Sequence, residues 1–281
     1  MGPQAPGEQP KLPIPGVQNI IAVGSGKGGV GKSTIAVNLA VTLAKLGNAV
    51  GLLDADVYGP NVPLMMGVRA TPHAIGQRIQ PLEAHGLRLM SMGFLNPGDK
   101  PLVWRGPMLN SVIQQFLRSV EWGPLDYLVI DLPPGTGDVQ LTLIQTTPLT
   151  GAIIVTTPSD VSLEDARKAV LMFEQVREPV LGIVENMSLH VCSSCGHVEH
   201  IFGQGGGQRM ANDYGVKLLG ELPLDALIRE EADGGTPSVV AAPSSARAQA
   251  YLRMARRTAA ALSRRARDRS APFPQIVVEE S

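Results

Sequence analysis

Short runs of aliphatic and β-branched residues alternate with longer amphipathic segments along most of the chain. Runs that are apolar at successive positions are typical of strands buried on both faces of a sheet. The expected strands are residues 20–24, 49–54, 87–91, 127–131, 152–156, 180–184 and 216–220. Because helical segments separate these runs, the pattern predicts an α/β fold with a doubly wound, mostly parallel sheet and helices on both faces.

Two of the intervening segments carry signals for helix ends. The segment 32–46 is followed by Gly47, a residue that suits the left-handed conformation after a helix C-terminus. The string SLED, which begins at Ser162, fits a capping box at the start of a second helix, ARKAVLMFEQV. The sequence therefore predicts a helix after the first strand and a helix opened by Ser162.

The two ends of the chain differ in composition from the region between them. Residues 1–18 are rich in Pro, Gly and Gln, which predicts a flexible leader. Residues 19–264 are expected to form one folded domain. Residues 265–281 are expected to be a disordered tail.

Composition narrows the classes of partner. Hydrophobic residues make up 44% of the 281 positions and the formal net charge is −1, so the chain can bury a core but has no bulk positive field for nucleic acid or an anionic membrane. Apolar runs such as AVNLAVTLA are too short to span a bilayer, and no secretory signal opens the sequence. The expectation is a cytoplasmic protein that binds neither nucleic acid nor membrane.

A glycine-rich loop follows the first expected strand and precedes a helix. The string GSGKGGVGKST at 24–34 contains the Walker A pattern, whose backbone N–H groups surround a polyphosphate at a helix N-terminus. Lys32 is expected to reach the β- and γ-phosphates of ATP or ADP, and the Ser33 hydroxyl is expected to ligate Mg²⁺. The loop residues predicted to bind nucleotide are Gly26, Lys27, Gly28, Gly29, Val30, Gly31, Lys32, Ser33 and Thr34.

Acidic residues end two of the expected strands. Carboxyl ends of parallel strands line the crevice where ligands bind, so these acids should face the phosphates. Asp131 fits the Walker B acid that holds Mg²⁺ through water. Asp56 resembles the switch I aspartate of one class of P-loop ATPases, which positions or deprotonates the attacking water, and it is counted with Lys27 and Lys32 as catalytic. For Asp54 and Asp138, capping of a turn is an equally good interpretation.

The second lysine of the loop, Lys27, points to a particular class. The string GKGGVGKST resembles the deviant Walker A loop of the ATPases that include MinD, ParA and the nitrogenase iron protein. In that class the early lysine reaches the partner subunit's nucleotide, so the resemblance implies a homodimer. Asn186, and the segment from Pro223 to Asp225, resemble the segments that contact adenine in this class, although Asn186 could equally form a turn.

The two cysteines, Cys192 and Cys195, have three competing interpretations. A redox dithiol normally sits at a helix N-terminus, whereas these residues lie in an expected loop. A zinc site would need two of the neighbouring histidines, His190, His197 and His200, which alternatively are solvated loop residues. In the third interpretation, two subunits bring together the four thiolates that a 4Fe-4S cluster requires.

A series of motifs extends the resemblance to one family. The chain is similar over residues 17–262 to the Mrp/ApbC family of iron–sulfur cluster carrier ATPases. The resemblance implies weak ATP hydrolysis, a homodimer with a bridging 4Fe-4S cluster on Cys192 and Cys195, and delivery of the cluster to apo iron–sulfur proteins. The motifs, in order, are SGKGGVGKST, DADVYGPNVP, SMGFL, WRGP, DLPPGTGD, ENMS, the Cys-x-x-Cys followed by Gly196, IFGQGGG and PLD.

Two features depart from that family. Many bacterial members carry a small additional N-terminal domain that this sequence lacks, and the residues between the cysteines are serines where members often have Pro and an aromatic residue or His. The segment WRGP at Trp104 to Pro107 is assigned only a packing role.

The main rival function is a positioning or partition switch of the MinD or ParA kind, with the cysteine pair binding zinc. A MinD-like protein needs a membrane-binding helix, and residues 251–269 have helical apolar spacing with many arginines. The apolar stripe, Leu252, Ala255, Ala259 and Leu262, is mostly alanine and lacks Trp and Phe, which favours packing on the chain's own sheet.

Overall fold

A nine-stranded sheet runs through the centre of the molecule. The computed structural model describes residues 11–95 and 106–270, and within them the strand order is β10-β9-β8-β1-β7-β2-β6-β5, with β11 paired to β9. The strands are β1 (Val17–Ser25), β2 (Val50–Asp54), β5 (Leu82–Ala84), β6 (Leu87–Ser91), β7 (Leu125–Asp131), β8 (Gly151–Thr156), β9 (Val180–Val191), β10 (Val198–Glu199) and β11 (Lys217–Pro223). A separate two-stranded hairpin is formed by β3 (Ala74–Ile75) and β4 (Arg78–Ile79).

Seven strands of this sheet pair parallel with one another, and within the sheet only β5 and β10 are added antiparallel, to β6 and β9. The register places Asp54 of β2 beside Asp131 of β7, and Val23 of β1 beside the same aspartate. The carboxyl ends of the three central strands therefore meet at one edge, where the glycine-rich loop begins.

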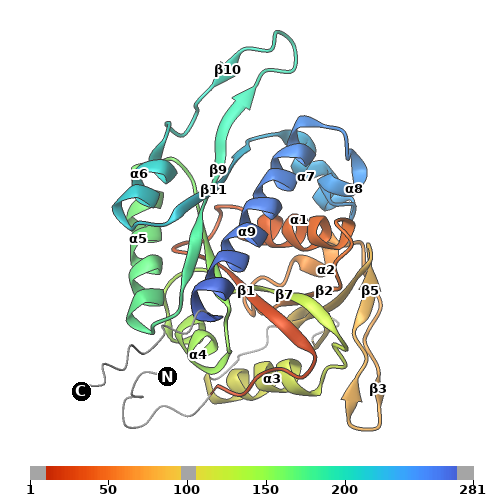
Figure 1. The fold of residues 1–281 in the computed structure, drawn as a ribbon. Coiled ribbons are helices and arrows are strands. Elements are labelled where there is room, and N and C mark those ends of the chain that lie inside the picture. Colours follow the sequence, from red (N-terminus) through yellow and green to blue (C-terminus); the bar gives the residue numbers. More distant parts are fainter. Residues whose placement is uncertain (1–10, 96–105, 271–281) are drawn as a thin grey trace, which may run out of the picture.

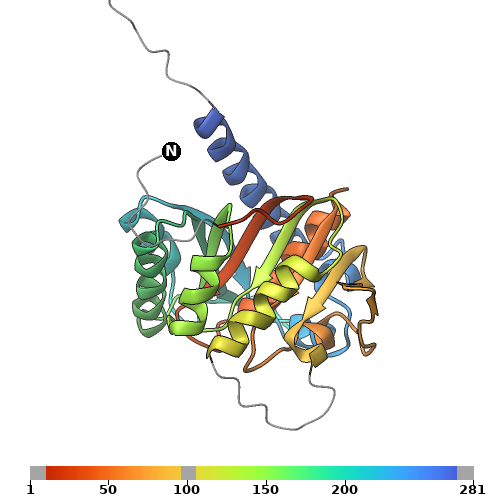
Figure 2. The same ribbon diagram turned by 90° about the horizontal axis from the view of Figure 1, so that it is seen from below.

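Helices cover both faces of this sheet (Figures 1 and 2). α1 and α9 pack against each other on one face, and α3, α4 and α5 lie on the other. The helices are α1 (Lys32–Lys45), α2 (Val62–Met65), the short 3₁₀ helix η1 (Met92–Leu95), α3 (Gly106–Ser119), α4 (Asp138–Thr146), α5 (Asp160–Gln175), α6 (Gly206–Asp213), α7 (Ala226–Asp233), α8 (Ser238–Ala241) and α9 (Ala246–Ser270). The predicted doubly wound α/β architecture is confirmed.

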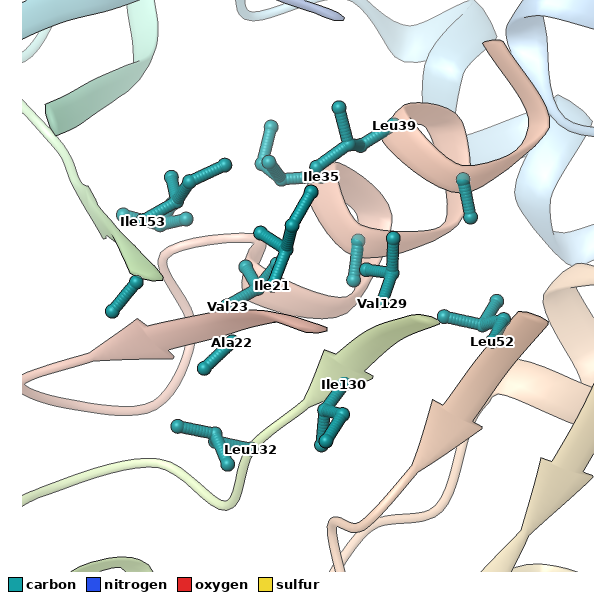
Figure 3. Close-up of a cluster of buried hydrophobic side chains, with 14 of the residues drawn as sticks. Ile21, Ala22, Val23, Ile35, Leu39, Leu52, Val129, Ile130, Leu132 and Ile153 are labelled. Atoms are coloured by element: carbon teal, nitrogen blue, oxygen red, sulfur yellow. The ribbon is translucent and has the colours of Figure 1, made fainter. Parts of the chain in front are cut away.

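The core lies between the central strands and their helices. Figure 3 shows Ile35 and Leu39 of α1 above Ile21 of β1 and Val129 of β7, and Ala22 on the opposite side of the sheet. These side chains are fully buried. Successive residues of a strand point to opposite faces, so the continuous apolar runs of the sequence correspond to strands covered on both sides.

The end signals of the two predicted helices have different outcomes. Gly47 follows α1 with φ +90°, which confirms the left-handed stop. The capping box at Ser162 is wrong, because α5 begins at Asp160 and Ser159 occupies the cap position. The Ser162 hydroxyl instead accepts a hydrogen bond from the backbone N–H of Thr157 at 3.3 Å, inside the first turn of the helix.

Strand and chain ends extend beyond the predicted limits. β1 begins at Val17 and β9 continues to Val191, well past the expected residue 184. Ile14, within the predicted leader, is buried. At the other end α9 is helical through Ser270, six positions beyond the predicted domain end at 264. Trp104 and Arg105 lie outside the described residues.

Candidate functional site

The glycine-rich loop lies between β1 and α1, and its conformation depends on glycine at two positions. Gly29 and Gly31 have φ values of +81° and +83°, in the left-handed region that side chains disfavour. Gly31 occupies the N-cap position of α1. The Ser25 hydroxyl donates a hydrogen bond to the Lys27 carbonyl at 2.9 Å, which closes the start of the loop. The N-terminus of α1 therefore opens directly onto the loop.

The two sides of this loop differ in how much room they have. A Cβ added at Gly26 would lie 2.0 Å from the backbone carbonyl oxygen of Asp165 in α5, so that side is packed. A Cβ added at Gly28 or Gly29 would meet nothing within 4 Å. The loop is thus supported from behind and open in front, which is the arrangement that a polyphosphate needs.

Lys32, the first residue of α1, is buried between acidic groups. Its ammonium nitrogen lies 2.6 Å from Oδ1 of Asp131 and 3.6 Å from Oδ2 of Asp56. It also lies 3.4 Å from the Ser33 hydroxyl. The structure therefore brings together the four residues predicted to act on the phosphates and Mg²⁺, contributed by α1, β7 and the loop after β2.

Asp131 has one carboxylate oxygen that no group satisfies. Oδ1 receives the Lys32 ammonium, whereas Oδ2 is buried without a hydrogen-bond partner among the described residues. Burial raises the pKa of Asp131, and Lys32 opposes that rise. A buried, unpartnered carboxylate oxygen near a serine hydroxyl is a suitable donor for Mg²⁺ or for a water bound to it.

Asp54 and Asp56 have separate roles. Asp54 is fully buried and accepts hydrogen bonds from the Ser91 hydroxyl at 2.8 Å and the Val62 N–H at 3.3 Å. Burial, together with the nearby charge of Asp131, raises the pKa of Asp54 from its ordinary value of 3.8 to about 8. Asp54 therefore organises the loop after β2, whereas Asp56 faces Lys32.

Asp56 holds its own loop with one oxygen and faces Lys32 with the other. Its Oδ1 accepts the backbone N–H groups of Tyr58 at 3.1 Å and Gly59 at 3.2 Å. Asp138, the other acid left open by the sequence, is exposed at the first turn of α4.

Asn186 lies against the phosphate loop. Its Nδ2 donates a hydrogen bond to the Val30 carbonyl at 2.9 Å, and a Cβ added at Gly31 would lie 2.3 Å from the same nitrogen. The next residue, Met187, has φ +56°, and the pairing of β9 with β11 is irregular here. The irregularity turns Asn186 toward the loop, so the structure places it at the nucleotide site without testing a contact with the base.

The segment Pro223–Asp225 joins the end of β11 to α7. Asp225 caps α7, since its Oδ1 accepts the Leu227 N–H at 2.9 Å, and its Oδ2 lies 3.7 Å from Arg247 of α9. Both carboxylate oxygens are therefore engaged within the chain. A nucleobase at this segment would meet its backbone rather than the Asp225 carboxylate.

Lys27 lies on the open side of the loop and is half-buried. Within residues 11–95 and 106–270 its ammonium group has no ion-pair partner. Its charge is available to a group outside the subunit.

Cys192 and Cys195 occupy the tip of an arm formed by β9 and β10, which projects from the body in Figure 1. Both are free thiols; Cys192 is half-buried and Cys195 is exposed. Hydrogen bonds from the backbone N–H groups of Ser194 and Cys195 lower the pKa of the Cys192 thiol, and burial opposes them weakly. The pair is therefore held in a tight turn, whose backbone N–H groups favour ionisation of Cys192.

The three neighbouring histidines do not complete a metal site with this pair. In the described part of the chain, no three His, Cys, Asp or Glu side chains are grouped so as to hold a metal ion. Nδ1 of His190 donates to the Leu224 carbonyl at 3.0 Å and Nδ1 of His200 to the Ser188 carbonyl at 2.8 Å, while His197 is exposed. Within one subunit the geometry gives two thiol ligands, not a tetrahedral zinc site.

α9 packs on the chain's own sheet. Its buried residues include Tyr251, Met254, Ala255, Thr258 and Leu262, and it contacts β11 and α1. Two residues of the predicted apolar stripe, Ala255 and Leu262, lie on this buried face. No helix among the described residues combines the length and apolarity needed to cross a membrane.

Several residues of the site escaped the sequence analysis. Ser91 ends a buried strand, as Asp54 and Asp131 do, so the same rule could have found it. Glu185 is a fully buried carboxylate that accepts the Ser188 hydroxyl at 2.7 Å and the Gly207 N–H at 2.5 Å. The roles of Glu185 and His190 depend on contacts with residues distant in the sequence, Gly207 and Leu224. No sequence pattern around either residue predicts these contacts.

Comparison with known families gives one match over most of the chain. A family model described as ParA, NUBPL iron-transfer P-loop NTPase, matches residues 16–259. Among curated relatives, the iron-sulfur cluster carrier protein of Haemophilus influenzae is 54% identical over 251 residues, which cover 89% of this chain and 68% of the relative. The iron-sulfur cluster carrier protein of Pseudomonas fragi is 54% identical over 248 residues, 86% of each chain.

Solved structures agree with the fold. A nucleotide-binding protein from Archaeoglobus fulgidus in complex with ADP aligns with a TM-score of 0.70 and 40% identity, over 78% of this chain and 87% of that one. The septum site-determining protein MinD of Pyrococcus horikoshii, complexed with Mg-ADP, aligns with a TM-score of 0.63 and 25% identity, over 84% and 94%. These likenesses confirm the predicted P-loop NTPase fold.

Proposed function

The chain belongs to the NUBPL family of iron-transfer P-loop NTPases, and from this premise we propose that it is an ATP-hydrolysing carrier of an iron–sulfur cluster. It binds ATP with Mg²⁺, holds a 4Fe-4S cluster between the cysteine pairs of a homodimer, and transfers the cluster to apo iron–sulfur proteins. One observation carries this proposal: the phosphate loop and a pair of free thiols, without further ligands in the described chain, lie at the two ends of one stretch of β9.

The nucleotide chemistry is assigned to the buried cluster around Lys32. Lys32 neutralises charge on the β- and γ-phosphates, and the open backbone at Gly28 and Gly29 gives the phosphates room. Ser33 and Asp131 would hold Mg²⁺, which supplies charge neutralisation when bound. Asp56, fixed by its own loop, orients the attacking water.

The cluster is treated as cargo. A 4Fe-4S cluster takes four thiolate ligands, and one subunit supplies Cys192 and Cys195. A second copy related by twofold symmetry supplies the other two. The unpaired ammonium group of Lys27 is assigned to the partner's nucleotide, so that ATP binding favours the dimer and hydrolysis loosens it.

The curated relatives, which are iron-sulfur cluster carrier proteins, support carriage of a cluster over a positioning switch. The packing of α9 also favours the carrier, because its apolar face is occupied by the chain's own sheet and is not available to lipid. A MinD-like membrane cycle would need such a face.

The decisive experiment is anaerobic reconstitution with iron and sulfide, followed by measurement of metal and acid-labile sulfide per subunit. About four iron and four sulfide per dimer are expected. The variant with Cys192→Ser and Cys195→Ser should bind ATP with normal affinity and lose both iron and sulfide. Equal iron and sulfide in this variant, or zinc without sulfide in the wild type, would contradict the bridging site.

A further inference from the structure

One continuous stretch of β9 joins the nucleotide site to the thiols. Asn186 contacts the phosphate loop at one end of this stretch, and Cys192 follows its last residue, Val191, at the other. Consecutive residues of a strand are mechanically coupled through the backbone, so a displacement at one end is carried along it. The contacts of the side chains between Asn186 and Cys192 determine which other parts of the protein can displace this stretch.

The far half of this stretch is tied to the segment that follows β11. Nδ1 of His190 donates a hydrogen bond to the Leu224 carbonyl at 3.0 Å, and the Leu224 N–H donates to the Leu189 carbonyl at 2.7 Å. Leu224 is the middle residue of the segment Pro223–Asp225, which the sequence resemblance predicts to contact the adenine base. Leu189 and His190 of β9 therefore contact that segment, and only Val191 separates them from Cys192.

His190 lies two residues before the first thiol, close enough that its charge is among the causes that lower the pKa of Cys192. Across the arm His190 is paired with Glu199 of β10. A movement of the His190 ring thus reaches the environment of Cys192 directly.

The other hydrogen bonds where the arm joins the body do not involve the segment Pro223–Asp225. Glu185 accepts the Ser188 hydroxyl and the Gly207 N–H at the start of α6, and His200 donates to the Ser188 carbonyl. These bonds connect the two sides of the arm and anchor it to α6. Of the arm's described side chains, only His190 hydrogen-bonds to the segment Pro223–Asp225.

We propose that His190 is a positioning residue that relays occupancy of the nucleotide site to Cys192 through its hydrogen bond to Leu224. The inference rests on the proposed function, since it takes Pro223–Asp225 as the base-contacting segment and Cys192 as a cluster ligand. When a nucleotide settles against the backbone of this segment, the Leu224 carbonyl shifts, His190 follows it, and the turn at Cys192 changes its exposure. The relay lets the carrier couple the nucleotide state to its affinity for the cluster.

The test uses the apo-protein with a single reporter thiol. In a Cys195→Ser background, the rate of alkylation of Cys192 by iodoacetamide is measured at one fixed pH, alone and with saturating Mg-ADP or a non-hydrolysable ATP analogue. Nucleotide affinity is measured on the same samples by calorimetry. The ratio of rates with and without nucleotide is the readout, because a purely structural effect would change both rates together.

Four chains are compared. The starting chain should show a rate ratio of about fivefold or more, the lower range of coupling between sites, and His190→Ala should bring it close to one with nucleotide affinity retained. His190→Asn, whose amide can donate to the same carbonyl, should restore the ratio. His197→Ala is the matched control, since it removes an exposed histidine of the same arm that bonds to no nucleotide segment, and it should keep the ratio.

Each result has a definite meaning. Nucleotide binding without any change of alkylation rate in the starting chain overturns the relay, as does a normal ratio in His190→Ala. Should His190→Ala fail to fold, His190→Phe fills the space without a donor and is read in the same way. Failure of the wild type to take up iron and sulfide on reconstitution overturns the proposed function separately, because the alkylation measurement involves no iron.

Discussion

The ammonium nitrogen of Lys32 lies 2.6 Å from Oδ1 of Asp131, and both side chains are buried at the carboxyl edge of the sheet. The pair is built from residues 99 positions apart in the chain. Removal of one member leaves the other as an uncompensated buried charge, which is costlier than the pair itself is stabilising. This relationship makes Lys32 important for folding, in addition to the phosphate binding proposed for it.

Lys32→Met should therefore lower the stability of the fold in a pH-dependent way. At pH 8 the loss is expected to be about 3–5 kcal/mol, the usual cost of breaking a buried pair. At pH 5.5 it should be smaller, because Asp131, whose pKa burial already raises, can take up a proton once Lys32 is gone. Urea unfolding at the two pH values measures the difference.

Lys32→Arg is the control for this prediction, because it retains a positive charge and should lose less stability at pH 8. ATP binding should be lost in Lys32→Met, as detected by calorimetry. An equal loss of stability at both pH values would show that Asp131 is not left charged and buried.

Asp54 should make the stability of the protein fall as pH rises. Its pKa is about 8 in the folded protein against an ordinary 3.8, so between these values the folded state binds a proton that the unfolded chain has released. The contribution of this group is fully present below about pH 4 and is lost as pH rises toward 8, at up to about 1.4 kcal/mol per pH unit. Asp54→Asn should flatten this slope in unfolding curves taken from pH 5 to 8.

Ser91→Ala provides a second test of the same group. The Ser91 hydroxyl donates to Asp54 and lowers its pKa, so the variant should move the sloping region to higher pH rather than abolish it. A slope unchanged in Asp54→Asn would mean that another group carries it.

Substitutions at two glycines with open surroundings, Gly28 and Gly47, should change ATP affinity and stability separately. A Cβ at Gly28 meets nothing within 4 Å and Gly28 has no positive φ, so Gly28→Ala should fold with near-normal stability. The added methyl group would occupy the open front of the loop, and ATP affinity should fall by tenfold or more, about 1.4 kcal/mol. Calorimetry with ATP and thermal unfolding measure the two effects.

Gly47→Ala is the matched control for this prediction. Its Cβ also meets open space, but the φ of +90° after α1 is strained for alanine, so stability should fall by about 1 kcal/mol. Its ATP affinity should stay normal because Gly47 lies at the far end of α1. Unimpaired ATP binding by Gly28→Ala would contradict the assignment of the open face to the phosphates.

Much of this fold and of the phosphate site could be predicted because their signals are local. The run IIAVG, the glycine loop and Lys32 are neighbours in the sequence, and all seven expected strands are present. A polar residue that ends a buried strand marks the ligand edge of a parallel sheet, which is how Asp131 was found. The acids of separate strands meet because parallel pairing places the carboxyl ends of these strands at the same edge of the sheet.

The missed features depend on side-chain hydrogen bonds that the hydropathy pattern does not show. β9 was expected to end at residue 184, because Glu185, Asn186 and Ser188 interrupt the apolar run; in the structure Glu185 and Ser188 hydrogen-bond to each other and remain buried. Ser162 resembled a cap, yet the helix begins two residues earlier and its hydroxyl bonds to Thr157. In each case a short-range side-chain hydrogen bond overrode the expected pattern.

Arg247 is expected to support, from α9, the segment Pro223–Asp225 that is predicted to contact the base. It lies 3.7 Å from Oδ2 of Asp225 and hydrogen-bonds through Nε to Oε2 of Glu231 at 3.1 Å, with only 13% of the Arg247 side chain exposed. The three residues connect the start of α7, its last turn and α9. Arg247→Met keeps most of the apolar stem and removes the charge, so Glu231 and Asp225 lose a shared partner.

The variant should be less stable by about 2–3 kcal/mol, because the largely buried Glu231 is left without its cation. It should also bind ATP more weakly, since the cap at Asp225 orients the backbone from Pro223 onward. Arg256→Met is the matched control, because Arg256 is an exposed arginine of the same helix. Urea unfolding and ATP calorimetry on both variants check the prediction. A loss of stability with unchanged ATP affinity would show that the segment keeps its binding conformation without Arg247, and equal effects in Arg256→Met would show that charge on α9, not this contact, is responsible.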